Sequence, residues 1–289
     1  MEKQSMKQSE LMIGIVILNY NSWADSVNCV KSINDSDIPC KYSIYLVDNK
    51  SPIQPSSEEK EYLEKNAHII EASENKGYAA GNNVGIKKAL KDGCEFILIC
   101  NSDILFAEKD IRNMVSFFDI QKDVGIVAPS VYDNEGTFHP LYFGIKTTYS
   151  VIIKNILLKT PFSCFLKEFE KSYIEYFPIK KPLERFSASG CCFMTSRECM
   201  QYLYPLDEGT FLYEEENIIG CRLEKTPYKV YVIPNTHVIH LEGNSTKNVS
   251  RFSKKCFVES EQYYMKKYLA VPCVKRIVLR LFRFVSLGV

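Results

Sequence analysis

The sequence predicts an α/β fold with a mostly parallel central sheet flanked by helices. Short apolar runs alternate with segments of helical periodicity over the first 130 residues, which is the order of parallel strands joined by helical crossovers. Three of the apolar runs end abruptly in Asn, Ser or Asp, as strands do at the edge where an open α/β sheet binds its ligand. At 289 residues, 46% of them hydrophobic, the chain can form one large domain with an appendage.

The first half is expected to contain strands and helices in alternation. The strands are expected at residues 12–18, 42–47, 68–71, 96–100 and 124–128, and the helices at residues 23–33, 56–65, 78–91 and 108–119. Continuous apolar runs indicate strands buried on both faces, and Asn and Ser after the first strand favour a turn and a helix cap. Pro129 is expected to end the fifth strand because proline has no N–H to donate to a sheet.

The second half is less regular. A segment rich in Phe, Tyr, Lys and Pro, residues 140–184, is interpreted as a variable insertion. Strands are expected at residues 187–195, 228–233 and 236–240, helices at residues 214–225 and 252–269, and a loop at residues 242–247. The chain is therefore divided into a main domain, 1–249, and a C-terminal helical extension, 250–289.

Polar side chains follow three of the predicted parallel strands. They are Asn19-Tyr20-Asn21, Asp48-Asn49 and Asn101-Ser102-Asp103. Because the carboxyl ends of parallel strands meet at one edge of a sheet, these groups are expected to converge on one crevice. A carboxylate placed there, such as that of Asp103, can hold a divalent metal ion against a phosphate.

A segment rich in glycine and asparagine, residues 75–85, is the second strong signal. Gly77 and Gly81 allow the backbone to come close to a ligand or to a helix. The segment matches neither the GxGxxG dinucleotide fingerprint nor the GxxxxGK(S/T) phosphate loop. A nucleotide bound here would therefore be held in another way.

Composition argues against several classes of protein. A net charge of +1 gives no field that would attract nucleic acid. The eleven cysteines form no CxxC pair, which argues against a zinc site. The first ten residues are polar and charged, so no signal peptide is expected, and a reducing cytoplasmic compartment is the simplest interpretation.

The C-terminal tail, residues 274–285, mixes cations with large apolar residues. Arg276, Arg280 and Arg283 are spaced i, i+4 and i+7, which places them on one face of a helix. A basic face opposite a face of Leu, Phe and Val suits peripheral contact with an anionic membrane surface. A helix packed on its own domain is the alternative interpretation.

Seven segments, in this order, resemble glycosyltransferase family 2, whose members have the GT-A nucleotide-sugar fold. The segments are 17–21 (ILNYN), 47–51 (VDNKS), 75–83 (NKGYAAGNN), 98–103 (LICNSD), 189–194 (SGCCFM), 213–216 (YEEE) and 238–243 (VIHLEG). The resemblance covers residues 12–130 and 187–247. It is closest to the rhamnosyltransferase-like subgroup that builds bacterial O-antigens and capsules.

The resemblance implies an inverting, metal-dependent glycosyltransferase. The donor would be dTDP-rhamnose or a UDP-sugar, and the acceptor a saccharide or a polyprenyl-linked oligosaccharide. The enzyme would act in O-antigen or capsule biosynthesis at the inner face of the bacterial plasma membrane. Residues 1–130 would bind the nucleotide sugar, and residues 131–249, with the insertion at 140–184, would form the acceptor side.

The resemblance also assigns roles residue by residue. Binding of the nucleotide sugar is assigned to Asn19, Asn21, Asp48, Asn75, Gly77, Asn82, Asn101, Ser102 and, from position alone, Lys247 and Arg251. Asp103 and His240 are assigned to Mg²⁺ or Mn²⁺, which suit oxygen ligands. Asn101 replaces the first Asp of the DxD-like motif and supplies no charge. Glu216 stands where the family usually has an Asp as general base, and Glu215 is the alternative.

The sequence is also compatible with two other classes of protein. A nucleotidyltransferase has a similar sheet, but it should carry a Gly-rich phosphate loop with a basic residue after the first strand, where this chain has Asn19-Tyr20-Asn21-Ser22. A catalytically silent scaffold that binds nucleotide sugars is compatible with Asn101 and with Glu216 in place of an Asp. The oligomeric state is left open.

Overall fold

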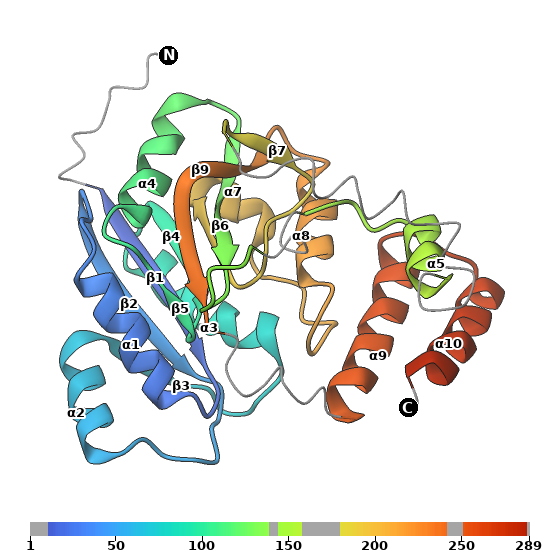
Figure 1. The fold of residues 1–289 in the computed structure, drawn as a ribbon, viewed down its shortest axis with the longest axis horizontal. Coiled ribbons are helices and arrows are strands. Elements are labelled where there is room, and N and C mark those ends of the chain that lie inside the picture. The colour runs from blue at the N-terminus through green and yellow to red at the C-terminus, as the bar shows by residue number, and fades with distance from the viewer. Residues whose placement is uncertain (1–10, 139–143, 158–179, 242–250, 288–289) are drawn as a thin grey trace.

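One sheet runs through the protein, and helices cover both of its faces (Figure 1). The computed structural model describes residues 11–138, 144–157, 180–241 and 251–287. Within these residues the sheet has nine strands. The predicted α/β class, with a central sheet flanked by helices, is confirmed.

The strands form where the sequence has its apolar runs. They are β1 (Met12–Asn19), β2 (Lys41–Asp48), β3 (His68–Glu71), β4 (Phe96–Asn101), β5 (Ile104–Leu105), β6 (Val124–Tyr132), β7 (Leu183–Arg185), β8 (Cys192–Ser196) and β9 (Lys229–His240). Residues 13–17 of β1 are all buried, as expected for a strand that is covered on both faces.

Most of the strands run in one direction. The sheet order is β3-β2-β1-β4-β8-β6-β9-β5, with β7 paired to β9. The pairs β3–β2, β2–β1, β1–β4 and β6–β9 are parallel. Because β8 is antiparallel to both β4 and β6, strands β6 and β9 run in the same direction as β1. Only β5, β7 and β8 of the described strands run the other way, so the sheet is mostly parallel, as predicted.

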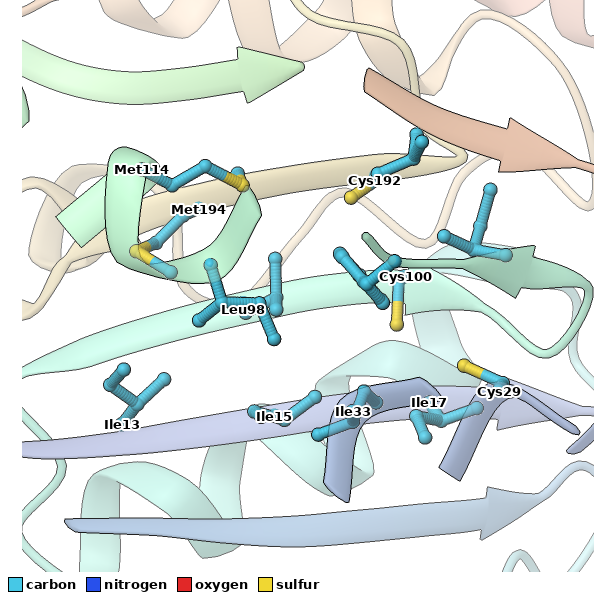
Figure 2. Packing of buried hydrophobic residues seen from close by; sticks show 14 of the residues in the cluster. Ile13, Ile15, Ile17, Cys29, Ile33, Leu98, Cys100, Met114, Cys192 and Met194 are labelled. Atoms are coloured by element: carbon cyan, nitrogen blue, oxygen red, sulfur yellow. The ribbon is translucent and has the colours of Figure 1, made fainter. Parts of the chain in front are cut away.

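The described helices form two groups: six pack on the two faces of the sheet, and the three at residues 149–157, 251–267 and 273–287 pack on one another. They are α1 (Trp23–Asn34), α2 (Ser57–Asn66), α3 (Tyr78–Lys91), α4 (Asp110–Ile120), α5 (Tyr149–Leu157), α7 (Arg197–Leu203), α8 (Glu215–Leu223), α9 (Arg251–Lys267) and α10 (Cys273–Leu287). Alternate side chains of β1 point to opposite faces. Ile13, Ile15 and Ile17 pack with α1, α2 and α4 (Figure 2), whereas Val16 packs with α3, α7 and α8.

Pro129 does not end β6, contrary to the prediction. The strand continues to Tyr132, and its pairing with β9 shifts register at the proline. Such a bulge interrupts the hydrogen-bond ladder at the proline, which has no N–H to donate. The predicted strands 228–233 and 236–240 form one continuous strand, β9. The register shift lies between these two parts of β9, where Asn235 has a φ of 60°.

Four elements have no counterpart in the sequence-based prediction. β5 and β7 contain two and three residues, too few to show an apolar period. α7 directly follows β8 and is capped by Ser196, whose side chain accepts a hydrogen bond from Cys199 N–H at 3.1 Å. α5 lies within the predicted insertion, of which residues 158–179 lie outside the described residues.

Helix α9 is fastened to the loop that precedes α8. Tyr263 Oη and Lys267 Nζ donate hydrogen bonds to the carboxylate of Asp207 at 2.7 and 2.8 Å. Ser260 Oγ donates to Leu212 O at 2.7 Å. The predicted C-terminal extension therefore supports the segment that leads into the acidic start of α8.

Two of the three tail arginines face the protein. Arg283 is buried, and its Nε and Nη2 donate to the Glu261 carboxylate of α9 at 3.0 and 2.5 Å. Arg276 is half-buried and its Nε donates to Val271 O at 3.1 Å. Among the described residues, no helix is both long enough and apolar enough to cross a lipid bilayer.

Most of the described cysteines pack as small apolar side chains. The ten cysteines that the structure describes are all free. Cys29, Cys100 and Cys192 lie in the core cluster shown in Figure 2. Burial raises the pKa of Cys192 well above its ordinary value, which keeps the thiol protonated. Packing is therefore the role of the buried cysteines, whereas Cys273 is exposed.

Candidate active site

The polar ends of β1, β2 and β4 lie side by side. In the parallel register Asn19 is opposite Asp48, and Leu18 is opposite Asn101. The N–H of Asn101 donates to Cys191 O at 2.9 Å, which joins the end of β4 to the segment before β8. The predicted convergence of these strand ends on one edge of the sheet is confirmed.

Asn19 is fully buried and holds the loop after β1 in place. Its Oδ1 accepts hydrogen bonds from Ser22 N–H at 3.0 Å and from Ser26 Oγ at 3.1 Å. Its Nδ2 donates to Asp48 Oδ1 at 3.3 Å. Both polar atoms are thus engaged inside the protein, and Asn19 positions the loops around the crevice. The role in nucleotide binding that the resemblance assigned to it stays a prediction.

Asp48 and Asn21 fasten the loops after β1 and β2 to each other. The N–H of Ser51 donates to Asp48 Oδ1 at 3.2 Å, and Ser51 Oγ accepts from Asn21 N–H at 2.8 Å. Asn21 Oδ1 accepts from Ile53 N–H at 3.1 Å. Asn21 has a φ of 58°, a region that Asn adopts more readily than most residues. The two loops are thus held as one unit.

The segment before α3 allows only glycine at position 77. Gly77 has a φ of 95°, and a Cβ there would lie 2.1 Å from Phe211 O. Asn75 Oδ1 accepts from Gly77 N–H and from Asn49 Nδ2, both at 3.0 Å. Tyr78 N–H donates to Phe211 O at 2.9 Å. The segment is therefore fixed both to the end of β2 and to the loop that precedes α8.

Helix α3 lies close against β1. A Cβ at Gly81 would lie 2.5 Å from Leu18 Cδ1, so a larger residue would push the helix away from the sheet. Asn82, assigned to nucleotide binding, is fully buried and its Nδ2 donates to Tyr78 O at 3.0 Å. Asn82 Oδ1 has no hydrogen-bond partner among the described residues, and the role of Asn82 in nucleotide binding stays a prediction.

A cavity of about 450 Å³ lies beside the segment before α3. The segment before α3, the loop before α8 and helix α9 all contribute to its lining. Its lining includes Asn75, Lys76, Glu208, Thr210, Phe211 and Ser260. Polar groups beside one aromatic ring are compatible with a polar ligand of modest size.

Asp103 and His240 are brought together at the end of β4. Strand β5 follows Asp103 directly and pairs with β9, so that Ile104 is opposite His240. The N–H of Leu241 donates to Asp103 O at 3.0 Å. His240 Nε2 lies 3.2 Å from Asp103 Oδ1, and 12% and 14% of the two side chains are exposed. The two residues assigned to one metal ion thus lie in contact.

The donor set suits a hard divalent cation that binds together with its substrate. One carboxylate and one imidazole are too few to hold Mg²⁺ or Mn²⁺ alone. The described part of the chain contains no group of three or more His, Cys, Asp or Glu side chains that could do so. Such ions commonly complete their coordination with water and substrate phosphates. Asp103 and His240 therefore fit an ion that arrives with a diphosphate.

Asp25, in the first turn of α1, is a further carboxylate near Asp103. Burial raises the pKa of Asp25 above its ordinary value, and the charge of Asp103 raises it further. Sequence reasoning missed Asp25, because an Asp in a first helical turn is normally explained by the helix dipole. The signal that could have identified it is its place shortly after the polar end of β1.

Three consecutive glutamates begin α8. Glu214 and Glu215 are buried, whereas Glu216 is partly exposed. Burial raises the pKa of Glu214 to about 7. Burial, with the charge of Glu216, raises the pKa of Glu215 to about 8, so Glu215 is mainly protonated at neutral pH. Burial also raises the pKa of Glu216.

Glu216 is joined to the end of β4 through the segment before β8. Its Oε1 accepts from Gly190 N–H at 3.1 Å, and Gly190 O accepts from Tyr78 Oη at 2.5 Å. Burial raises the pKa of the next residue, Cys191, to about 12, and the charges of Asp103 and Glu216 contribute. Both carboxylates therefore lie near the Cys191 thiol. Sequence reasoning missed the role of Gly190, although the small residues before β8 signalled a close approach.

The remaining assigned residues are placed differently. Ser102 is buried in the turn between β4 and β5. Lys247 lies outside the described residues. Arg251 is exposed at the first residue of α9.

The chain matches a known family over most of its length. The profile of the family described as Glycosyl transferase family 2 matches residues 14–203. A relative, the low-salt glycan biosynthesis hexosyltransferase Agl10 of Haloferax volcanii, is 27% identical over 210 residues, which are 71% of this chain and 59% of Agl10. The chain therefore corresponds to less than two thirds of the length of that relative.

Three solved structures illustrate the similarity of the fold. GalNAc-T7 with UDP, GalNAc and Mn²⁺ has a TM-score of 0.61 at 16% identity, covering 96% of this chain and 55% of that one. The mannosyltransferase PcManGT of Pyrobaculum calidifontis, in complex with GDP-Man and Mn²⁺, has a TM-score of 0.55 at 14% identity, covering 94% and 69%. S. aureus TarS 1–349 has a TM-score of 0.54 at 12% identity, covering 96% and 80%. The likeness shows the fold, and the predicted GT-A fold is confirmed.

Proposed function

The chain belongs to glycosyl transferase family 2, and we propose that it transfers a sugar from a nucleoside diphosphate to an acceptor hydroxyl with inversion at the anomeric carbon. The observation that carries the proposal is the pair of contacts that joins Glu216 to the end of the strand that leads to Asp103. Gly190 N–H donates to Glu216 Oε1, and Asn101 N–H donates to Cys191 O, the next residue. A single displacement needs a group that binds the departing diphosphate and a base for the acceptor. Asp103 and Glu216 supply these two groups from different elements of the fold.

In the proposed reaction Glu216 removes the acceptor proton. The acceptor O–H gives its proton to the Glu216 carboxylate as its oxygen forms a bond to C1 of the sugar. The bond between C1 and the diphosphate oxygen breaks, and its electron pair leaves with the diphosphate. Attack from the opposite face inverts C1. Glu216 is preferred to Glu215 because it is partly exposed and oriented by Gly190 N–H, whereas Glu215 is buried.

Asp103 and His240 would hold Mg²⁺ or Mn²⁺, with further ligands from the diphosphate of the donor. When bound, such an ion neutralises the charge that develops on the leaving diphosphate. Because Asn101 supplies no charge, the affinity for the free ion is expected to be low until the donor is present. Mn²⁺ accompanies the nucleotide or nucleotide sugar in the GalNAc-T7 and PcManGT structures, which supports this choice of ion.

The nucleotide would lie between the joined loops after β1 and β2 and the segment before α3. Asn21, Asp48, Asn75 and Gly77 shape this place, and Asn19 supports it from below the surface. dTDP-rhamnose and UDP-sugars are the proposed donors. The UDP of the GalNAc-T7 structure and the GDP-Man of the PcManGT structure support a nucleoside diphosphate as the common element.

The proposed acceptor is a saccharide or a polyprenyl-linked oligosaccharide of bacterial O-antigen or capsule biosynthesis. The hexosyl transfer in glycan biosynthesis for which Agl10 is named supports a glycan acceptor. A lipid-linked acceptor would place the protein at the cytoplasmic face of the plasma membrane, with residues 274–285 as the peripheral contact.

The configuration of the product tests the proposal. A thermal-shift screen of nucleotide sugars with Mn²⁺ selects the donor, because a ligand that binds the native state raises its stability. The selected donor is then incubated with saccharide acceptors, and the anomeric proton is followed by NMR. We expect a product of the opposite anomeric configuration. A donor that binds but is never consumed would instead identify a silent binding scaffold.

A further inference from the structure

Five apolar side chains of helix α10 point outward. Val274, Ile277, Val278, Leu281 and Phe282 are 73%, 53%, 48%, 62% and 59% exposed. At about 100° per residue they fall within an arc of roughly 140° on the helix surface. Single exposed apolar residues are common, but a contiguous apolar stripe marks an interaction surface. These five residues are called the outer stripe of α10.

The inner face of α10 fixes the helix in this orientation. Leu279 is buried in a cluster with Ile152 of α5. Arg283, 4% exposed, pairs with Glu261, 1% exposed, through two hydrogen bonds. The Arg283 guanidinium also lies 5.1 Å from the centre of the Phe257 ring. Turning the outer stripe inward would leave Glu261 buried without this partner, which is strongly unfavourable. The outer stripe is therefore not the face through which α10 folds onto the protein.

The charges beside the outer stripe have one sign. Helix α10 contains Lys and Arg but neither Asp nor Glu. Lys275 and Arg280 are exposed, and in helical projection they border the stripe on its two sides. In a two-fold contact with a second copy these cations would face cations across the interface. An anionic lipid surface would complement them.

We propose that the outer stripe of α10 docks the protein on an anionic lipid bilayer. The helix lies in the plane of the interface, its apolar side chains enter the boundary between head groups and acyl chains, and Lys275 and Arg280 contact the head groups. The sequence placed the tail arginines together as one basic face. In the structure Arg276 and Arg283 turn toward the protein, so the outward apolar face carries the docking. The inference rests on the proposed function in that docking serves a lipid-linked acceptor.

Vesicle co-sedimentation of the full chain tests the docking. The probes are vesicles of phosphatidylcholine with phosphatidylglycerol, and vesicles of phosphatidylcholine alone. The double variant Ile277→Glu/Leu281→Glu should lose binding to the anionic vesicles by about tenfold or more, since it puts two charges into the apolar boundary. The matched control is Ile120→Glu, which replaces a 70% exposed apolar residue of α4 and should bind as the unmodified chain does.

The charge contribution has its own variant. Lys275→Gln/Arg280→Gln should weaken binding to the anionic vesicles and leave the weaker binding to phosphatidylcholine unchanged. Equal vesicle binding by Ile277→Glu/Leu281→Glu and the unmodified chain would overturn the proposal. So would a dimer of the unmodified chain that the double variant abolishes without any vesicle binding, because the stripe would then meet a second copy.

Catalysis is measured separately, so that the two proposals can fail independently. With a water-soluble acceptor, Ile277→Glu/Leu281→Glu should transfer sugar as the unmodified chain does. Asp103→Asn should lose transfer and bind vesicles normally. Normal transfer without stripe-dependent vesicle binding would overturn the docking alone, and stripe-dependent binding without any transfer would overturn the proposed function alone.

Discussion

The backbone N–H of Gly190 lies 3.1 Å from Oε1 of Glu216 and donates a hydrogen bond to it. This contact connects the start of α8 to the segment that precedes β8, which in turn bonds to the end of β4 through Cys191 O. The proposed base is thus oriented by backbone whose position is set by the sheet. A side chain at position 190 would lie directly against the carboxylate, because a Cβ there would be 2.9 Å from Oε1.

Gly190→Ala should therefore lower catalysis more than stability. The φ of Gly190 lies outside the left-handed region, so alanine is compatible with the backbone, and the added methyl group meets the movable end of Glu216. Displacing the base by a fraction of an ångström should lower kcat about ten- to hundredfold. Steady-state kinetics with thermal unfolding would check this. Unchanged kcat in a folded variant would contradict the orienting role of Gly190.

Substitutions of Asp103 and of His240 should change the metal dependence of transfer to different degrees. Asp103→Asn removes the charged ligand and should abolish transfer at any practical Mn²⁺ concentration. His240→Gln should raise the Mn²⁺ concentration for half-maximal activity about 10- to 100-fold. Activity is measured during Mn²⁺ titration at saturating donor. Asp35→Asn, at an exposed position after α1, is the control and should leave the titration unchanged. A titration that His240→Gln leaves unshifted would argue against its place at the ion.

Gly77→Ala should destabilise the protein more than the comparable change at Gly93. Both glycines have positive φ, 95° and 86°, but a Cβ at Gly77 meets Phe211 O at 2.1 Å whereas a Cβ at Gly93 has nothing within 4 Å. The conformational strain alone costs about 1–2 kcal/mol. Gly93→Ala should lose about this much in urea unfolding, and Gly77→Ala about 3 kcal/mol or more. Equal losses would show that the contact with Phe211 does not limit position 77.

The stability of the protein should fall as pH rises, in part because of Glu215. Its folded-state pKa of about 8 lies above the ordinary value of 4.5, so the folded protein holds a proton that the unfolded chain releases. The stabilisation is full below about pH 4.5 and is lost as pH rises through about 8. Glu215→Gln keeps a neutral side chain, so it should flatten this dependence and be more stable at pH 8.5 by about 1 kcal/mol or more.

Chemical unfolding at pH 5.5 and 8.5 measures the difference. Glu58→Gln, at an exposed position of α2, is the control and should keep the pH dependence of the unmodified chain. If Glu215→Gln also keeps that dependence, Glu215 is ionised in the folded protein. Glu215 would then again be a candidate for the base.

Local patterns were enough to predict most of the fold. The buried runs of β1, β2 and β4 and the periodicity of α3 depend on residues close in sequence, and their positions agree with the structure. β5 could not be predicted, because two residues form a strand only through pairing with β9. The bulge at Pro129 has the same origin, since it depends on the register of the partner strand.

The candidate site was predictable in place but not in detail. Polar residues at three strand ends were enough to locate the edge of the sheet where Asp48 and Asp103 lie. Packing between segments that are distant in sequence decides which of those residues are buried. The burial of Asn19 could therefore not be predicted. The direction in which the tail arginines point could not be predicted from the sequence either, because it depends on Glu261 of another helix.

Glu216, as the proposed base of the glycosyl transfer, can be tested by a variant that keeps its shape. Glu216→Gln keeps the shape and the acceptor oxygen at the Gly190 N–H but cannot take a proton. The measurement is kcat for transfer to a saccharide acceptor, with donor affinity in the presence of Mn²⁺ determined by calorimetry. We predict a loss of about 10²- to 10⁴-fold in kcat with donor affinity unchanged. Transfer that survives in Glu216→Gln at the rate of the unmodified chain would contradict the role of Glu216 as the base.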